Sequence, residues 1–137
     1  MGAKVAGMVR PDEAIAKFDL KAEPHVVSEG RALVAETLID WSLGHLVDDV
    51  KLIASELITD AVDATLGRPI WLVLRRGRDA LSIGIWDSSS DTPRMLPAAP
   101  GEESGRGLRI IAALADDHGS LSVGNPKGKL VWARVQI

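Results

Sequence analysis

The sequence of 137 residues contains no cysteine, which excludes disulfide bonds and thiolate metal sites and suits a reducing cytoplasm. It also has no run of about 18 apolar residues, the length that a membrane-spanning helix requires. Its 16 basic and 19 acidic side chains give a net charge of −3, so nothing favours binding to nucleic acid or anionic lipid. Residues 1–10 lack the apolar stretch of a secretory signal. We therefore expect a cytoplasmic protein that binds neither membranes nor nucleic acid directly.

The composition is that of a single globular domain. Apolar residues make up 46% of the chain, which is enough for a buried core and too high for general disorder. Residues 1–13 mix small and charged side chains, and we expect a flexible leader there. Residues 14–137 are expected to form one folded domain.

Hydrophobic periodicity divides the domain into strands and helices. Apolar side chains at gaps of three and four residues predict helices over residues 24–41, 45–66 and 104–115. Alternating or continuously apolar runs predict strands over residues 14–20, 70–74, 80–86, 118–123 and 129–137. The stretch from 87 to 103 holds three prolines and has no periodicity, which is typical of a lid or a mobile loop.

The order of these elements places two helices between the first and second strands and is not a repeating βαβ pattern. It predicts an α+β fold, a two-layer sandwich with helices on one face of a mixed, mostly antiparallel sheet. The tryptophans Trp71, Trp86 and Trp132 lie on predicted strands. Two interpretations stay open for them: all three lie in the core, or at least one faces the core and another an interface.

The predicted helix over residues 45–66 carries three carboxylates on one face. Glu56 and Asp60 are four residues apart, and Asp63 follows three residues later. Acids this close repel one another unless a cation or a hydrogen-bond donor lies between them. The spacing is therefore consistent with a ligand site, or with an ordinary solvated helix face.

Asp87 ends an apolar strand directly before the long loop. Ligand contacts are often made where a rigid element gives way to a loop. A carboxylate in that position can accept a hydrogen bond from an exocyclic amine such as that of adenine. The alternative is a turn residue that only ends the strand.

A glycine-rich segment, Ser104-Gly105-Arg106-Gly107-Leu108, opens the last predicted helix. Its glycines allow backbone N–H groups at the helix N-terminus to approach an anion, and Arg106 can hold phosphate oxygens. The segment lacks the spacing of a Walker loop and does not directly follow a strand. The alternative is a flexible entry to the helix with Ser104 as its N-cap.

Together, these motifs and their order resemble the GHKL (histidine kinase-like) ATPase superfamily over roughly residues 15–137. The likeness is greatest to bacterial anti-sigma-factor serine kinases and actinobacterial ATP-binding regulators. Their N box reads E-L-x-x-N-A, and Glu56-Leu57-Ile58-Thr59-Asp60-Ala61 matches it except at the asparagine. Asp87 falls on the adenine-binding aspartate, Ser104 to Leu108 on the second glycine box, and Gly128-Lys129-Leu130-Val131-Trp132-Ala133 looks like the last strand of the actinobacterial members.

The resemblance implies the Bergerat α/β sandwich and binding of ATP with Mg²⁺. It implies that Glu56 is the general base, that Asp60 replaces the asparagine that ligates Mg²⁺, and that Asp87 recognises adenine. It assigns further nucleotide contacts, beneath a lid over residues 88–103, to Gly105, Arg106, Gly107 and Leu108. It also implies a homodimer that phosphorylates a serine of a partner, either an anti-anti-sigma (STAS-type) protein or a sigma factor.

The sequence departs from the kinase pattern in ways that add negative charge. Asp60 replaces asparagine, Glu103 stands where the kinases carry a basic residue, and the motif D-x-G-x-G is absent after Asp87. ATP binding is therefore favoured over efficient kinase activity, and an inactive module that sequesters its partner stays an alternative. A third hypothesis is a metal-dependent hydrolase that uses Glu56, Asp60 and Asp63.

Overall fold

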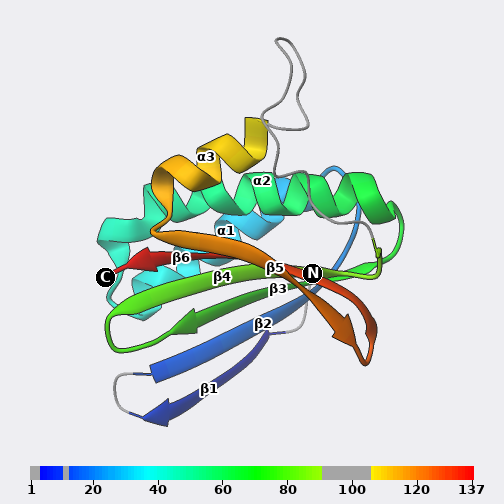
Figure 1. Ribbon diagram of the computed structural model, residues 1–137. Coiled ribbons are helices and arrows are strands. Elements are labelled where there is room, and N and C mark those ends of the chain that lie inside the picture. Colours follow the sequence, from blue (N-terminus) through cyan, green and yellow to red (C-terminus); the bar gives the residue numbers. More distant parts are fainter. Residues whose placement is uncertain (1–3, 11–12, 91–105) are drawn as a thin grey trace.

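The computed structural model describes residues 4–10, 13–90 and 106–137 (Figure 1). These residues form six strands, three α-helices and one short 3₁₀ turn. In chain order the elements are β1 (Lys4–Arg10), β2 (Glu13–Lys21), α1 (Val26–Asp40), η1 (Gly44–Leu46), α2 (Val47–Thr65), β3 (Pro69–Arg76), β4 (Ala80–Asp87), α3 (Arg106–Leu114), β5 (Asp117–Gly124) and β6 (Lys127–Gln136). The expected glycine-rich entry to α3 at Ser104 and Gly105, and residues 91–103 of the expected lid, lie outside the described residues.

The strands form one sheet in the order β1-β2-β3-β4-β6-β5. Every neighbouring pair is antiparallel, so the expectation of a mixed sheet is wrong for the described strands. The reason is the position of β6, which lies between β4 and β5 and pairs with both. Strands β4 and β5 run in the same direction but never meet, so no parallel pair forms.

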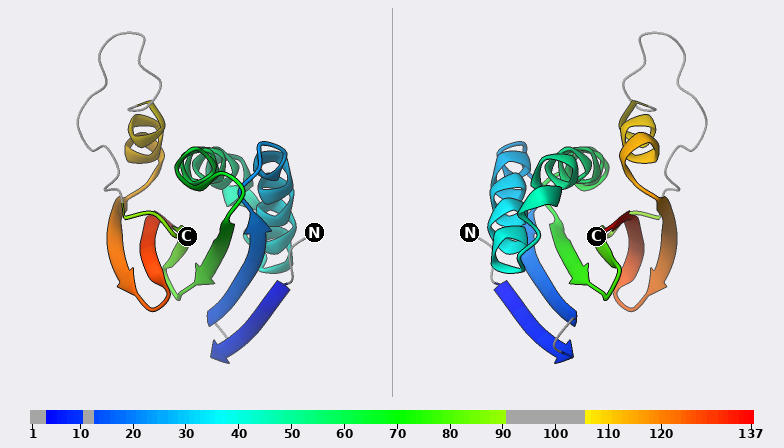
Figure 2. Two further views of the ribbon diagram at one scale, coloured as in Figure 1. Left: turned by 90° about the vertical axis from the view of Figure 1, so that its right-hand side faces the viewer. Right: turned by 90° about the vertical axis from the view of Figure 1, so that its left-hand side faces the viewer.

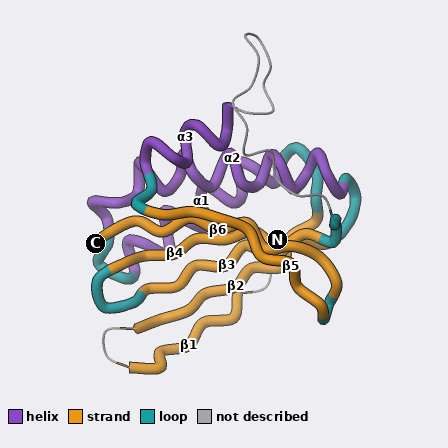
Figure 3. The backbone as a smooth tube through the Cα atoms, viewed as in Figure 1, coloured by secondary structure: helices purple, strands orange, loops and turns teal. Residues whose placement is uncertain are grey.

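All three helices cover one face of the sheet, which confirms the predicted two-layer α+β sandwich (Figures 1 and 3). Helix α2 lies between α1 and α3, as the side views show (Figure 2). No helix in the described parts of the chain is long and apolar enough to cross a membrane.

The core lies between the two layers. Along β2, β3 and β4, alternate side chains point to the helices and are buried, as expected for a sheet covered on one face. Helix α2 contributes a buried stripe with helical spacing that faces them. The largest fully buried side chains are Phe18, Leu38, Leu43, Ile53, Ile58, Ile70, Leu72, Leu74, Leu81, Ile83, Ile85 and Ile111.

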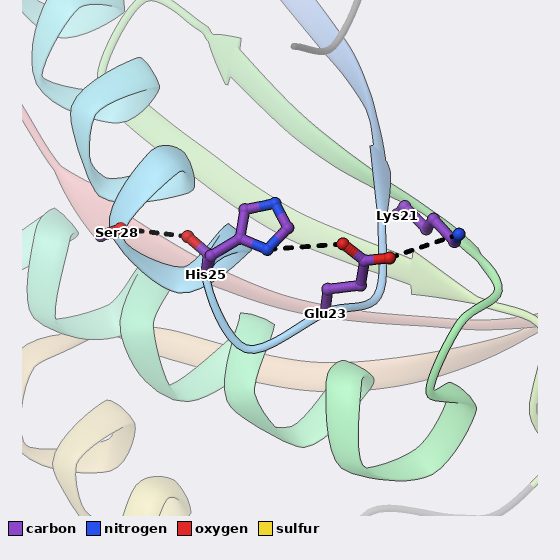
Figure 4. A network of polar contacts seen from close by, with 4 residues as sticks. All are labelled: Lys21, Glu23, His25 and Ser28. Atoms are coloured by element: carbon purple, nitrogen blue, oxygen red, sulfur yellow. Dashed lines mark hydrogen bonds and ion pairs between the residues drawn. The ribbon is translucent and has the colours of Figure 1, made fainter.

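A polar network holds the entry to α1 (Figure 4). Glu23 forms an ion pair with Lys21, whose Nζ lies 3.3 Å from Oε1, and its Oε2 lies 3.4 Å from Nδ1 of His25. The Ser28 hydroxyl donates to the carbonyl oxygen of His25 at 3.0 Å. These contacts fix the turn after β2, although exposed pairs of this kind contribute only about 0–1 kcal/mol each.

Residues Lys4–Arg10 form strand β1, where the sequence predicted part of a flexible leader. The strand pairs antiparallel with β2 at the edge of the sheet, with an irregular register between Gly7 and Arg10. The local sequence has no clear alternation, so the pairing depends on the adjacent strand β2 rather than on a periodic pattern.

Trp71, Trp86 and Trp132 all lie on the sheet face opposite the helices, so the expectation that at least one of them faces the core between the layers is wrong, whereas a place for one of them in an interface stays a prediction. Trp71 pairs with Trp86 across β3 and β4, and their rings stack with centroids 4.4 Å apart. Gly84 of β4 pairs with Trp132 of β6 on the same face. None of the three belongs to the core cluster between the layers.

Candidate functional site

A pocket of about 290 Å³ opens where α2 and α3 meet the ends of β4 and β6. Its walls are mainly apolar, and its polar groups are three carboxylates and one ammonium. The lining residues are Leu57, Asp60, Ala61, Asp63 and Ala64 from α2, Ile85 and Asp87 from β4, Leu108 from α3, and Lys129 and Val131 from β6.

Asp87 is the last residue of β4 and is only 1% exposed. Its Oδ1 accepts a hydrogen bond from the backbone N–H of Ser89 at 2.9 Å. Its Oδ2 lies 3.8 Å from Nζ of Lys129. A carboxylate has about four lone-pair sites, so Asp87 is oriented by these two neighbours and can still accept a hydrogen bond from a ligand.

The register between β4 and β6 brings Lys129 to this position, because Lys129 pairs directly with Asp87. The preceding residue, Gly128, is buried, and a Cβ there would overlap the carbonyl oxygen of Asp87. Glycine therefore lets β6 approach the end of β4. The sequence alone predicted no role for Lys129, because no local pattern indicates the pairing of two strands that lie far apart along the chain.

Glu56 is half-buried on α2 beside the first turn of α3. A Cβ at Gly107 would lie 2.6 Å from Oε2 of Glu56, so the carboxylate contacts the backbone of α3 directly. The partial positive charge of a helix N-terminus stabilises a carboxylate in that position. The absence of a side chain at Gly107 thus allows the Glu56 carboxylate to contact α3. This role adds to the phosphate contact that the family resemblance implies.

Asp60 lies one turn after Glu56 and lines the pocket, with its side chain exposed as a whole. Desolvation at the pocket wall, and then the negative charges of Glu56 and Asp63, raise the pKa of Asp60 from 3.8 to about 6. Asp87 adds to the rise and Lys129 opposes it. Because the side chain is exposed, water screens part of this effect.

The raised pKa of Asp60 predicts a pH-dependent stability. A carboxyl group whose pKa is higher in the folded than in the unfolded chain binds its proton more tightly when folded, so ionisation favours unfolding. Ionisation of this group is therefore expected to lower the free energy of unfolding as the pH rises from 3.8 to about 6. Asp60→Asn removes the carboxyl group. Its free energy of unfolding should therefore increase relative to that of the wild-type protein over the same pH interval.

Urea unfolding of both proteins at a series of pH values, in the presence of a chelator, measures this difference. The stability of Asp60→Asn relative to wild type should rise between pH 3.8 and about 6 and stay constant above that range. A difference that is the same at every pH would show that the Asp60 carboxyl does not carry a raised pKa.

The structure brings together most of the predicted site residues that it describes. Asp60, Asp87 and Leu108 line one pocket, and Glu56 and Gly107 are adjacent to each other beside it. Arg106 is the first residue of α3, while Gly105 lies outside the described residues.

The three acids of the hydrolase hypothesis do not form a metal centre. Within the described residues, no group of three or more histidine, aspartate or glutamate side chains is placed to hold a metal ion. Mg²⁺ bound together with a nucleotide needs only one or two carboxylates in addition to phosphate oxygens and water. Asp60 fits that lesser requirement.

The pocket fits a flat heterocycle with an amino group. Leu57, Ala61, Ile85 and Val131 provide apolar walls, and Asp87 provides a hydrogen-bond acceptor among them. Its volume of about 290 Å³ lies just below the range of about 300–1,000 Å³ typical of ligand pockets, which suits a base and sugar better than a whole nucleoside triphosphate.

A protein-family model described as a histidine kinase-like ATPase domain matches residues 20–135. No curated protein sequence matches the chain. The matched stretch runs from the end of β2 to the end of β6 and includes every residue that lines the pocket. It confirms the superfamily resemblance, whereas the finer likeness to anti-sigma-factor kinases stays a prediction. The chain therefore belongs to the family of histidine kinase-like ATPase domains.

Proposed function

We propose that the protein binds ATP in this pocket, together with Mg²⁺, and uses it to regulate another protein. The observation that carries the proposal is the carboxylate of Asp87, buried at the end of β4 between apolar walls. A buried acceptor in an apolar pocket suits the exocyclic amine of adenine. Asp60, at the exposed side of the pocket, would contribute to Mg²⁺ binding beside the phosphates.

The proposed reaction is transfer of the γ-phosphoryl group of ATP to a serine of the partner. Glu56 accepts the hydroxyl proton while the serine oxygen bonds to the γ-phosphorus and the bond to the bridging oxygen of ADP breaks. Its position beside the first turn of α3 supports this role, because the glycine box is expected to hold the phosphates there. Catalysis would rest mainly on positioning and charge neutralisation.

An inactive module that sequesters its partner is the second candidate. The cluster of Glu56, Asp60, Asp63 and Asp87 favours it, since the negative charges that add to desolvation in raising the pKa of Asp60 also oppose a polyphosphate. Release of inorganic phosphate from ATP, and transfer of label to a STAS-type protein or a sigma factor, separate the candidates. Turnover above the uncatalysed rate supports the kinase; ATP binding without turnover supports the inactive module.

We also propose a homodimer. The sheet face opposite the helices supports it, since this face carries a hollow of about 250 Å³ lined by apolar side chains that include Leu130 and Trp132. Leu121 lines the same hollow and is 56% exposed. A second copy could bury these side chains, which a monomer leaves in contact with water.

Leu121→Asp is expected to prevent this dimer, because it would place a charge in the interface. Light scattering should give the mass of a dimer for the wild-type protein and of a monomer for the variant. A monomer in both, at concentrations well above those of the binding assays, would contradict the proposal.

A further inference from the structure

We propose that Lys129 reads the base alongside Asp87, by donating a hydrogen bond to the ring nitrogen that neighbours the exocyclic amine. The inference rests on the proposed ATP site and names a second specificity-determining residue in it. Asp87 alone would recognise only the amine. With Lys129 beside it, the pocket presents an acceptor and a donor to one edge of the ring.

Lys129 lies inside the pocket beside Asp87. Its side chain is only 13% exposed and lines the pocket, and Nζ lies 3.8 Å from Oδ2 of Asp87. Among the residues that the structure describes, it is the one cationic side chain that lines this pocket. Asp87 and Lys129 occupy directly opposed positions of β4 and β6, so the sheet places their side chains next to each other.

The contact between Lys129 and Asp87 is too long for a hydrogen bond. At 3.8 Å the two atoms form an ion pair, but they lie beyond the range of about 2.7–3.2 Å in which N–H donates a hydrogen bond to oxygen. An ammonium group has three N–H donors, so an ion pair with one carboxylate leaves donors for other acceptors. The Lys129 ammonium can therefore donate to an acceptor that enters the pocket.

Adenine has a hydrogen-bonding edge that matches this pair of side chains. Its amino group is a donor and a neighbouring ring nitrogen is an acceptor, so one edge of the ring can bind both an acceptor and a donor of the protein. Asp87 and Lys129 present these two groups side by side. The carboxylate of Asp87 also attracts the ammonium of Lys129 and holds it toward the pocket rather than toward solvent.

The test combines a change in the protein with a change in the ligand. Two ATP analogues are used, in which a CH group replaces either ring nitrogen N1 or ring nitrogen N7. Each is titrated, as is ATP, into the wild-type protein, Lys129→Met and the control Lys127→Met. Met preserves most of the volume of the side chain, and Lys127 is an exposed lysine on the same strand.

In the wild-type protein and in Lys127→Met, one analogue should bind about 10-fold more weakly than ATP, because it lacks the acceptor for a charged donor. Lys129→Met should bind ATP about 10-fold more weakly than the wild type and should not distinguish ATP from that analogue. Lys129→Arg, which keeps a cationic donor, should restore part of the discrimination. Circular dichroism and thermal unfolding establish that each variant is folded.

The inference is overturned if neither analogue binds more weakly than ATP to the wild-type protein, or if the discrimination persists in Lys129→Met. If Lys129→Met does not fold, the same criterion is applied to Lys129→Leu, whose side chain also lacks a hydrogen-bond donor. Absence of ATP binding to the wild-type protein is a different result, since it contradicts the proposed ATP site as well as the role of Lys129.

Discussion

Replacing Glu56 with glutamine is expected to lower the rate of phosphate release from ATP by about 10²- to 10⁴-fold, the usual contribution of a general base. Glutamine has nearly the same volume and preserves the contact with the backbone at Gly107. It cannot accept the proton that a water molecule or a serine hydroxyl gives up during attack. The affinity for ATP should change little, because Glu56 is not among the residues that line the pocket.

Phosphate release under saturating ATP measures the rate, and calorimetry measures the affinity of the same preparations. Glu36→Gln is a matched control, since Glu36 is an exposed glutamate on the neighbouring helix α1. Wild-type turnover in Glu56→Gln would exclude Glu56 as the base. A large loss of affinity in this variant would instead indicate that Glu56 holds the nucleotide or the helix α3.

Asp87→Asn is expected to raise the dissociation constant for ATP by about 10- to 100-fold, since hydrogen bonds to charged groups contribute about 1.5–3 kcal/mol. The substitution conserves shape but removes the charge at the buried end of the pocket. It also leaves Lys129 without the carboxylate that lies 3.8 Å from its Nζ. An unpaired ammonium that is only 13% exposed would also lower the stability of the folded protein.

The matched control for this prediction is Asp63→Asn, which removes a carboxylate from the exposed rim of the same pocket. In the absence of Mg²⁺ its affinity for ATP should stay near or above that of the wild-type protein, because it reduces the repulsion of the phosphates. Unchanged affinity in Asp87→Asn, with a folded protein, would exclude Asp87 as the group that recognises adenine.

Helix α2 illustrates what the sequence could predict. The stripe of Leu46, Val50, Ile53, Leu57 and Ala61 has the spacing of one helix face, and all five side chains are buried. The predicted helix over 45–66 agrees with Val47–Thr65, because periodicity is a strong signal over a segment of this length. Once α2 is placed, the positions of Glu56 and Asp60 on one helix face follow from their spacing.

The positions of the tryptophans could not be predicted in the same way. The run from Ile70 to Leu74 is continuously apolar, so its pattern does not distinguish the buried from the outer face of a strand. The structure places Ile70, Leu72 and Leu74 in the core and Trp71 on the outer face. The choice is made by packing against the helices, which no local pattern records.

Asp87 and Lys129 differ in how far the sequence alone could predict their place in the pocket. Asp87 could be predicted as a candidate site residue because it ends a strand before an aperiodic loop, a feature that is local in sequence. Lys129 could not, because its position depends on the register between β4 and β6, which α3 and β5 separate along the chain. The part of this site that depends on long-range strand pairing therefore could not be predicted from the sequence.

The measurement that tests the account most directly is calorimetric titration of the wild-type protein with ATP, with and without Mg²⁺. We expect one binding site per chain, in the micromolar range, and weaker binding when Mg²⁺ is removed, because the carboxylates around Asp60 then repel the phosphates without compensation. Absence of binding under both conditions would contradict it. The pocket between α2, α3, β4 and β6 would then not be a nucleotide site, and the protein would have to act through its partner-binding surfaces alone.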